Sequence, residues 1–216
     1  MNMRNSLVIY LSAVIGAAGC AREINHAPVN APELPVYRTA DLTPHWPGID
    51  LQLDDRDNPD FPKFQLTDQA GRPFANRDLS GHIVVASFFY SRCSDLCPRL
   101  RSSLSQVRAA FAGDSRLLLV SHSITPNTDT PEMLAAYAKT NQIDGAGWKL
   151  LTGPAPVIEA LEHQGYLVPR ARSDQPAMHS EMLVLLDPHQ RVRGVYNGTL
   201  QTELGFLERD IRALEK

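Results

Sequence analysis

Two cysteines, four positions apart, are the residues of this 216-residue chain best suited to chemistry. Cys93 and Cys97 follow an apolar stretch typical of a buried strand, and Pro98 begins a pattern typical of a helix. We expect Pro98 at the first helical position, so that Cys97 lies near the positive end of the helix dipole. That place favours the thiolate, which is both a nucleophile and a ligand of soft metal ions.

The spacing of this cysteine pair narrows the chemistry. Three residues separate Cys93 from Cys97, whereas redox proteins of the thioredoxin type place two residues between their cysteines. The longer loop leaves room for both sulfurs to point at one ion, and two thiolates select Cu(I) or Zn(II) over hard cations such as Mg(II). A structural disulfide, or two buried free thiols, is the alternative without a metal.

Two sulfurs make an incomplete metal site, so a third ligand is to be sought among the seven histidines. His179 precedes a predicted strand and follows a long loop rich in Pro, Arg and Ser at 168–178. Its residue chemistry alone does not separate a ligand from a structural histidine. The others are expected in an N-terminal segment, on the surface or as structural neighbours of buried strands: His26, His45, His163, His189, His82 and His122.

The elements that must position these residues follow from apolar periodicity. The run 82–89 is continuously β-branched and aromatic, as in a strand buried on both faces. Strands alternating with helices, then a closing hairpin and a terminal helix, predict an α/β fold with a mixed central sheet flanked by helices. We expect an edge hairpin at 61–71, further strands at 117–121, 182–186 and 192–196, and helices at 98–111, 131–141, 155–165 and 202–214.

The N-terminal residues are typical of an export signal. Arg4 precedes an apolar stretch that is too short to span a bilayer comfortably and ends in Ala17-Ala18-Gly19-Cys20. Small residues before a cysteine resemble the bacterial lipoprotein signal. Residues 1–20 are therefore predicted to be such a signal, cleaved just before Cys20, which would become the lipidated first residue of the mature chain. A plain signal or an uncleaved anchor with an incidental Cys20 is the alternative.

Composition bounds the rest of the chain. The segment 21–54 is rich in proline and is predicted to be a tether, and 55–216 is predicted to be one domain. The net charge of −3 and the isoelectric point near 6.1 give no footprint for nucleic acid. If Cys20 carries lipid, Cys93 and Cys97 remain as an isolated pair in an oxidising compartment.

The motif from Phe88 to Pro98, a Cys-x-x-x-Cys-Pro after an aromatic strand, resembles the signature of the Sco/SenC family. Further blocks follow in the order found in that family and cover nearly all of 60–216: 129–131, 148–153, 179–180 before a strand ending at 186–187, and 194–199. The family commonly has Asp-Pro where this chain has Thr125-Pro126. Asp129 is expected, with Glu132, to form a capping box for the helix that begins at Thr130.

The resemblance implies a thioredoxin-like fold that binds one copper ion through Cys93, Cys97 and His179. It also implies a role in delivering copper to the binuclear site of cytochrome c oxidase, or in preparing the thiols of that site. The expected partners are the copper-site subunit of the oxidase, a thiol reductant or copper donor protein, and a membrane held through the lipid anchor on the extracytoplasmic face of a bacterial envelope.

Two enzyme functions compete with this metallochaperone role. An exported thiol–disulfide reductase would cycle the same cysteines between dithiol and disulfide, with Cys93 attacking first. A thiol peroxidase would place a threonine three residues before its reactive cysteine, where this chain has Tyr90 before Cys93 and Ser94 before Cys97. The inserted loop residue and the presence of His179 favour copper binding over the reductase.

Overall fold

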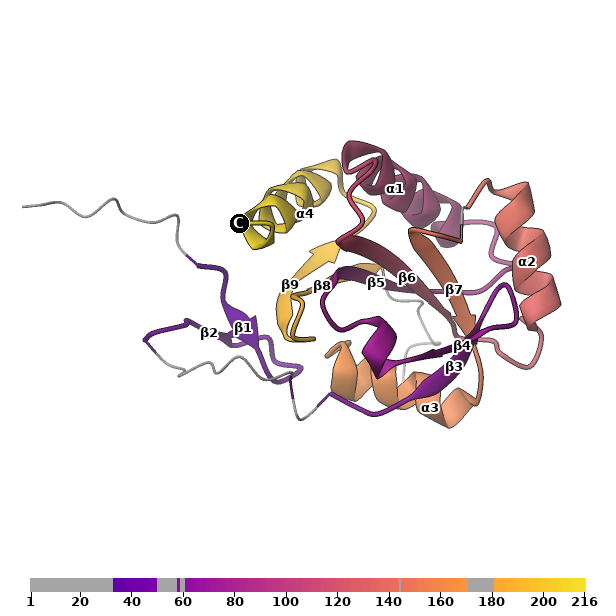
Figure 1. The fold of residues 1–216 in the computed structure, drawn as a ribbon, viewed down its shortest axis with the longest axis horizontal. Coiled ribbons are helices and arrows are strands. Elements are labelled where there is room, and N and C mark those ends of the chain that lie inside the picture. Colours follow the sequence, from indigo (N-terminus) through magenta and orange to yellow (C-terminus); the bar gives the residue numbers. More distant parts are fainter. Residues whose placement is uncertain (1–32, 50–57, 59–60, 144, 171–180) are drawn as a thin grey trace, which may run out of the picture. The chain divides into compact units, whose positions relative to one another are not determined.

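The computed structural model describes residues 33–49, 58, 61–143, 145–170 and 181–216, which form one mixed sheet with helices on both faces (Figure 1). The sheet order is β2-β1-β9-β8-β5-β6-β7-β3-β4. The strands are β1 Val36–Tyr37, β2 Pro44–His45, β3 Gln65–Asp68, β4 Pro73–Ala75, β5 Ile83–Phe89, β6 Leu117–Ser123, β7 Trp148–Thr152, β8 Met182–Leu186 and β9 Val192–Asn197. The helices are α1 Leu96–Ala110, α2 Pro131–Thr140, α3 Ala155–Ala160 and α4 Gln201–Leu214.

The centre of the sheet is parallel and its flanks are antiparallel. β5, β6 and β7 run parallel, joined through α1 and α2, while β8 is antiparallel to β5. β5 is buried along its whole length, as its continuous apolar sequence predicts for a central strand covered on both faces. The expected α/β fold with a mixed central sheet flanked by helices is confirmed.

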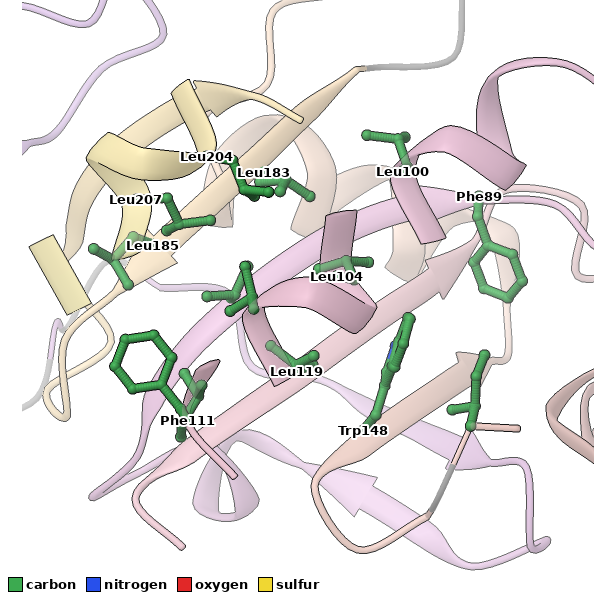
Figure 2. Close-up of a cluster of buried hydrophobic side chains, with 14 of the residues drawn as sticks. Phe89, Leu100, Leu104, Phe111, Leu119, Trp148, Leu183, Leu185, Leu204 and Leu207 are labelled. Atoms are coloured by element: carbon green, nitrogen blue, oxygen red, sulfur yellow. The ribbon is translucent and has the colours of Figure 1, made fainter. Parts of the chain in front are cut away.

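Each face of the sheet buries its own apolar core. On one face, α1, α2 and α4 pack over residues such as Phe89, Leu119 and Trp148, and Figure 2 shows this cluster. On the other face, α3 and the helical turn Leu161–Gly165 cover Phe88. Alternate residues of β5 therefore contribute to opposite cores, because successive side chains of a strand point to opposite faces.

His122, at the end of β6, belongs to the core beneath α3. Its side chain is fully buried, its ring stacks on Phe88, and its Nε2 lies 3.0 Å from the Tyr166 hydroxyl. His122 is thus a buried core residue, as expected, although its buried Nδ1 has no hydrogen-bond partner among the described residues.

The segment predicted as a tether is partly folded onto the sheet. Within the described residues 33–49, β1 pairs with β2 and, through Tyr37, with Val192 of β9. β2 is the outermost strand, so the missing N–H of Pro44 is tolerated there. Proline density indicated an extended chain, but it could not indicate that two short extended pieces would find a sheet edge.

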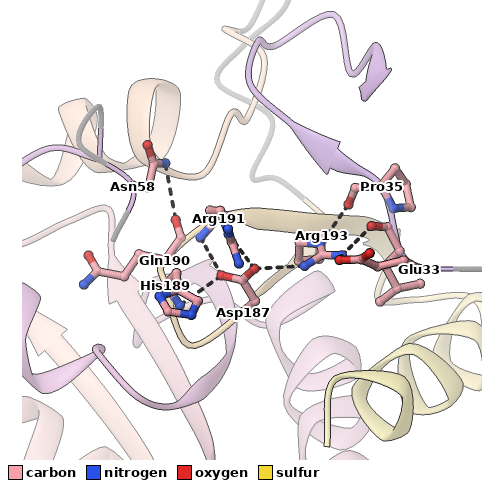
Figure 3. Close-up of polar contacts among 9 residues, drawn as sticks. Glu33, Pro35, Asn58, Asp187, His189, Gln190, Arg191 and Arg193 are labelled. Carbon is pink, nitrogen blue, oxygen red and sulfur yellow. Dashed lines mark hydrogen bonds and ion pairs between the residues drawn. The ribbon is translucent and has the colours of Figure 1, made fainter. Parts of the chain in front are cut away.

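A buried arginine fastens this segment to the domain (Figure 3). The Arg193 guanidinium is 4% exposed and donates hydrogen bonds to the backbone carbonyls of Leu34 and Pro35. It also donates to Asp187, 2.9 Å away, and that carboxylate accepts a further bond from Arg191. Because the buried ions are paired and hydrogen-bonded, they secure 34–35 against β9 without leaving an isolated charge in the core.

In the part of the chain that the structure describes, none of the helices combines the length and the apolar character that a membrane crossing requires.

Candidate metal centre

Cys93 and Cys97 lie together where β5 passes into α1. β5 ends at Phe89, and the Cys93 backbone N–H then donates to the Tyr90 carbonyl in a tight turn. Cys97 lies in the first turn of α1 and is 3% exposed, whereas Cys93 is half-buried. Both are free thiols, and the Cys97 backbone N–H donates to the Cys93 sulfur at 3.3 Å. The structure thus brings the two predicted sulfur ligands into one site.

Helix α1 begins earlier than the sequence predicted. Its first residue is Leu96, so Pro98 is the third helical residue rather than the first. Proline is still accommodated, because the first four N–H groups of a helix have no carbonyl partner within it. The shift matters chemically, since the N–H of Cys97 is one of these free donors and the Cys93 sulfur accepts it.

The two thiols consequently differ, and in the opposite sense to the sequence prediction. Burial alone would raise the pKa of Cys93, but hydrogen bonds from Cys97, from the Asp95 backbone and from the Tyr90 side chain outweigh it and lower that pKa. Burial, and after it the neighbouring Cys93, raise the pKa of Cys97 to about 12. The hydrogen bonds at the helix start therefore favour the thiolate of Cys93 rather than that of Cys97.

The wall behind Cys97 is mostly apolar. A small pocket borders the cysteine and is lined by Phe89, Leu100, Tyr137 and Trp148, among others. Its polar lining residues include Ser87, Ser121 and Arg101, and Arg101 donates a hydrogen bond to the Tyr137 hydroxyl at 3.3 Å. The buried side of the Cys97 sulfur is therefore mostly apolar, a surrounding that limits the access of water to it.

Asp129 was expected to cap α2, and that expectation is wrong. The N-cap is Thr130, whose side chain accepts the backbone N–H of Met133 at 3.4 Å. Asp129 is 1% exposed, and its carboxylate instead accepts hydrogen bonds from Ser91 in the loop before Cys93. Sequence reasoning missed this role, although one signal existed: Asp129 follows β6, and the carboxyl ends of parallel neighbours such as β5 and β6 meet at one edge of a sheet.

The chain enters β8 at this same edge, close to α1. Glu181 lies immediately before β8, and its backbone carbonyl accepts the N–H of Gly198 at 2.7 Å. The Gly198 carbonyl accepts from Ser103 of α1, and a Cβ on Gly198 would come within 2.5 Å of Leu100. Glycine at 198 therefore lets the turn before α4 contact both α1 and the residue that precedes β8.

Of the other predicted site residues, His179 and Cys20 lie outside the described residues. Across the described ranges, no group of three or more His, Cys, Asp and Glu side chains is arranged to hold a metal ion. The described part of the centre thus consists of two sulfurs. These donors suit a soft ion. Glu181, two residues after position 179 and immediately before β8, is held beside α1 through Gly198.

Comparison with known proteins gives consistent matches. The family model described as SCO1/SenC matches residues 54–213. The structure of a SCO1/SenC family lipoprotein from Bacillus anthracis str. Ames is 27% identical with a TM-score of 0.65, and the match covers 76% of this chain and 100% of that one.

Two further solved structures share the fold. BsSco, described as a member of the Sco family of cytochrome c oxidase assembly proteins with a disulfide switch, matches with a TM-score of 0.63 and 20% identity, over 77% of this chain and 99% of its own. Bradyrhizobium japonicum ScoI, solved with copper bound, matches with a TM-score of 0.57 and 24% identity, over 70% and 97%. The thioredoxin-like fold expected from the sequence is confirmed by these likenesses.

Proposed function

This chain belongs to the SCO1/SenC family, and we therefore propose that it binds copper through Cys93, Cys97 and His179 and supplies it to the binuclear copper site of cytochrome c oxidase. The observation that carries the proposal is the pairing of two sulfurs at the start of α1. The copper-bound ScoI and the oxidase-assembly role given for BsSco support it. Copper here is cargo, so the site must both bind it and release it.

The unequal thiols give a sequence of events for loading. Cys93, whose pKa is lowered, offers a thiolate to Cu(I) first. Cys97, whose pKa is raised to about 12, keeps its proton until the ion replaces it, so binding releases a proton from this sulfur. Cu(I) affinity is then expected to rise with pH, and a partner that returns the proton to Cys97 would favour release.

His179 completes this proposal as the third ligand. β8 begins three residues after it, and Glu181, just before β8, is held beside α1 through Gly198. His179→Ala is expected to lower Cu(I) affinity by at least about 10-fold, since removing a ligand costs no less than removing a residue that supports one. Titration with a Cu(I) competitor measures this on the reduced protein.

The matched control is His189→Ala. His189 lies in the turn after β8, at the opposite end of that strand, so its loss should leave Cu(I) affinity within about twofold of wild type. Equal losses in the two variants would exclude His179 as a ligand. Unfolding in urea, recorded for each, separates ligand loss from instability.

A second function, thiol–disulfide exchange, is favoured by one observation. Cys93 combines partial exposure with a lowered pKa, and Cys97 is buried with a raised pKa, which suits an attacking and a resolving thiol. The two functions are compatible, because a copper carrier must be reduced before loading and the same reduced pair is able to act on the thiols of its target. An insulin reduction assay on wild type and His179→Ala separates them: turnover unaffected by the mutation, with unchanged Cu(I) affinity, would favour the reductase.

Anchoring is the remaining part of the proposal. We propose that Cys20 is lipidated and holds the domain at the extracytoplasmic face of a bacterial membrane, where the oxidase subunit and a thiol reductant or copper donor would meet it. The lipoprotein from Bacillus anthracis supports this. Cys20→Ser is expected to move the protein from the membrane to the soluble exported fraction, because the lipid chains supply the membrane affinity. Equal membrane recovery of wild type and variant in fractionation would contradict it.

A further inference from the structure

We propose that Asp129 is a positioning residue that sets the geometry of the Cys93–Cys97 pair through Ser91, and thereby the reduction potential of that pair. Its bearing on copper rests on the proposed function, whereas its bearing on the thiols does not. Asp129 touches neither sulfur in the structure, so it acts through the loop that carries Cys93.

The carboxylate of Asp129 is a buried hub. Its Oδ1 accepts the Ser91 hydroxyl at 2.5 Å, and its Oδ2 accepts the Ser91 backbone N–H at 3.1 Å. Oδ2 also accepts the hydroxyls of Ser123, at 2.6 Å, and Thr125, at 3.1 Å. A carboxylate that is 1% exposed needs such donors in place of water, and four hydrogen bonds supply them.

These bonds join three pieces of chain at one edge of the sheet. Ser91 lies in the loop after β5, Ser123 ends β6, and Thr125 begins the connection to α2. The Ile124 N–H donates to the Phe89 carbonyl, so the two strand ends are already paired when the carboxylate binds beyond them. Asp129 thus holds the chain in place for two residues beyond the end of β5, as far as Ser91 in the cysteine loop.

Ser91 connects the Asp129 carboxylate to the loop that carries Cys93. It stands two positions before Cys93 and is held by both its backbone and its side chain. The next contacts along the chain, from the Cys93 N–H to Tyr90 and from the Cys97 N–H to the Cys93 sulfur, complete the turn. A disulfide tolerates only a narrow range of Cβ separations, so a small displacement of Ser91 changes the balance between dithiol and disulfide.

The test compares three variants of the full chain, each with one serine replaced. Ser91→Ala deletes the hydroxyl that bonds to Asp129, and Ser91→Thr keeps it. Ser123→Ala deletes a different hydroxyl from the same carboxylate, one that belongs to β6 and not to the cysteine loop. Each protein is equilibrated in glutathione buffers, and the oxidation state of Cys93 and Cys97 is read by alkylation and peptide mass.

We expect Ser91→Ala to shift the dithiol–disulfide equilibrium constant by roughly 10-fold, which is about 30 mV for this two-electron couple. Ser91→Thr and Ser123→Ala should stay within about threefold of wild type. Asp129→Asn, if it folds, should shift the potential at least as far as Ser91→Ala. Combining it with Ser91→Ala should add little, because the two residues act through one contact.

Urea unfolding of each variant separates positioning from plain stability. Should Ser91→Ala and Ser123→Ala lose stability alike and leave the potential unchanged, Asp129 would be a structural hub and no more, and the inference would be overturned. Titration of the reduced proteins with a Cu(I) competitor should also show a Cu(I) affinity about 10-fold lower for Ser91→Ala than for wild type. A wild type that binds no Cu(I) would sink the proposed function, while the potentials would still decide the role of Asp129.

Discussion

Oxidation of Cys93 and Cys97 to a disulfide is expected to abolish Cu(I) binding. Neither sulfur then remains a thiolate, and the thiolate is the form that binds soft metals. The two cysteines lie together at the start of α1, where the Cys97 N–H contacts the Cys93 sulfur at 3.3 Å. Competition titration of the oxidised protein should show a loss beyond about 1,000-fold, because two of the three proposed ligands disappear together.

Reduction and replacement supply the controls for this result. Restoring the dithiol should restore Cu(I) affinity in full, which excludes irreversible damage. Cys97→Ser and Cys93→Ser should each lose most of the affinity for Cu(I), and urea unfolding of each variant checks that it remains folded. If the oxidised protein held Cu(I) as tightly as the reduced one, the assignment of both sulfurs as ligands would be wrong.

The expected coupling of redox state to copper follows from the unequal thiols. A lowered pKa at Cys93 favours its attack on disulfides, and in the proposed function the same sulfur is the first ligand of Cu(I). Copper and a disulfide therefore compete for the same sulfur. If the contact between Asp129 and Ser91 tightens Cu(I) binding as proposed, it should also protect the pair from oxidation.

Local sequence signals predicted what local forces decide. The run through Val84, Val85 and Ala86 indicated a strand buried on both faces, because an exposed face would have required polar residues at alternate positions. The apolar spacing of Leu100, Leu104 and Val107 likewise predicted the buried face of α1. The pairing of the two sulfurs was also predictable from local sequence, because only four positions separate Cys93 from Cys97.

Contacts between distant segments were beyond the sequence. Nothing near Arg193 indicates that its guanidinium would reach the carbonyls of Leu34 and Pro35, some 160 positions earlier. The Asp129 carboxylate bonds to Ser91, which lies 38 positions earlier in the chain. The nearby Glu132 suggested a capping box instead, because that pattern is visible within a few residues. The order of the thiol pKa values depended on a helix start two residues earlier than Pro98 indicated, which turned the free N–H of Cys97 toward Cys93.

The structure also predicts a marked loss of stability in acid, caused by His122. Burial lowers the pKa of His122 from 6.5 to about 3, because the charged ring would lose its water. In the unfolded chain the histidine takes up a proton below pH 6.5, and in the fold it does not until about pH 3. The contribution of neutral His122 to the free energy of unfolding is therefore complete above pH 6.5. As the pH falls it decreases by ~1.4 kcal/mol per pH unit, which amounts to about 5 kcal/mol at pH 3.

Urea unfolding at pH 7 and pH 4 measures this effect, with about 3 kcal/mol expected from His122 over that interval. The double variant His122→Leu, Tyr166→Phe removes the ionisable ring together with its hydroxyl partner, so no buried polar group is left unpaired. It should lose about 3 kcal/mol less than wild type on acidification. Tyr166→Phe alone keeps the histidine and should retain the full acid sensitivity of the wild type. Carboxylates also titrate between these pH values, but they are common to all three proteins and cancel in the difference. Identical losses in the double variant and in Tyr166→Phe would show that His122 accepts a proton in the fold as readily as in the unfolded chain.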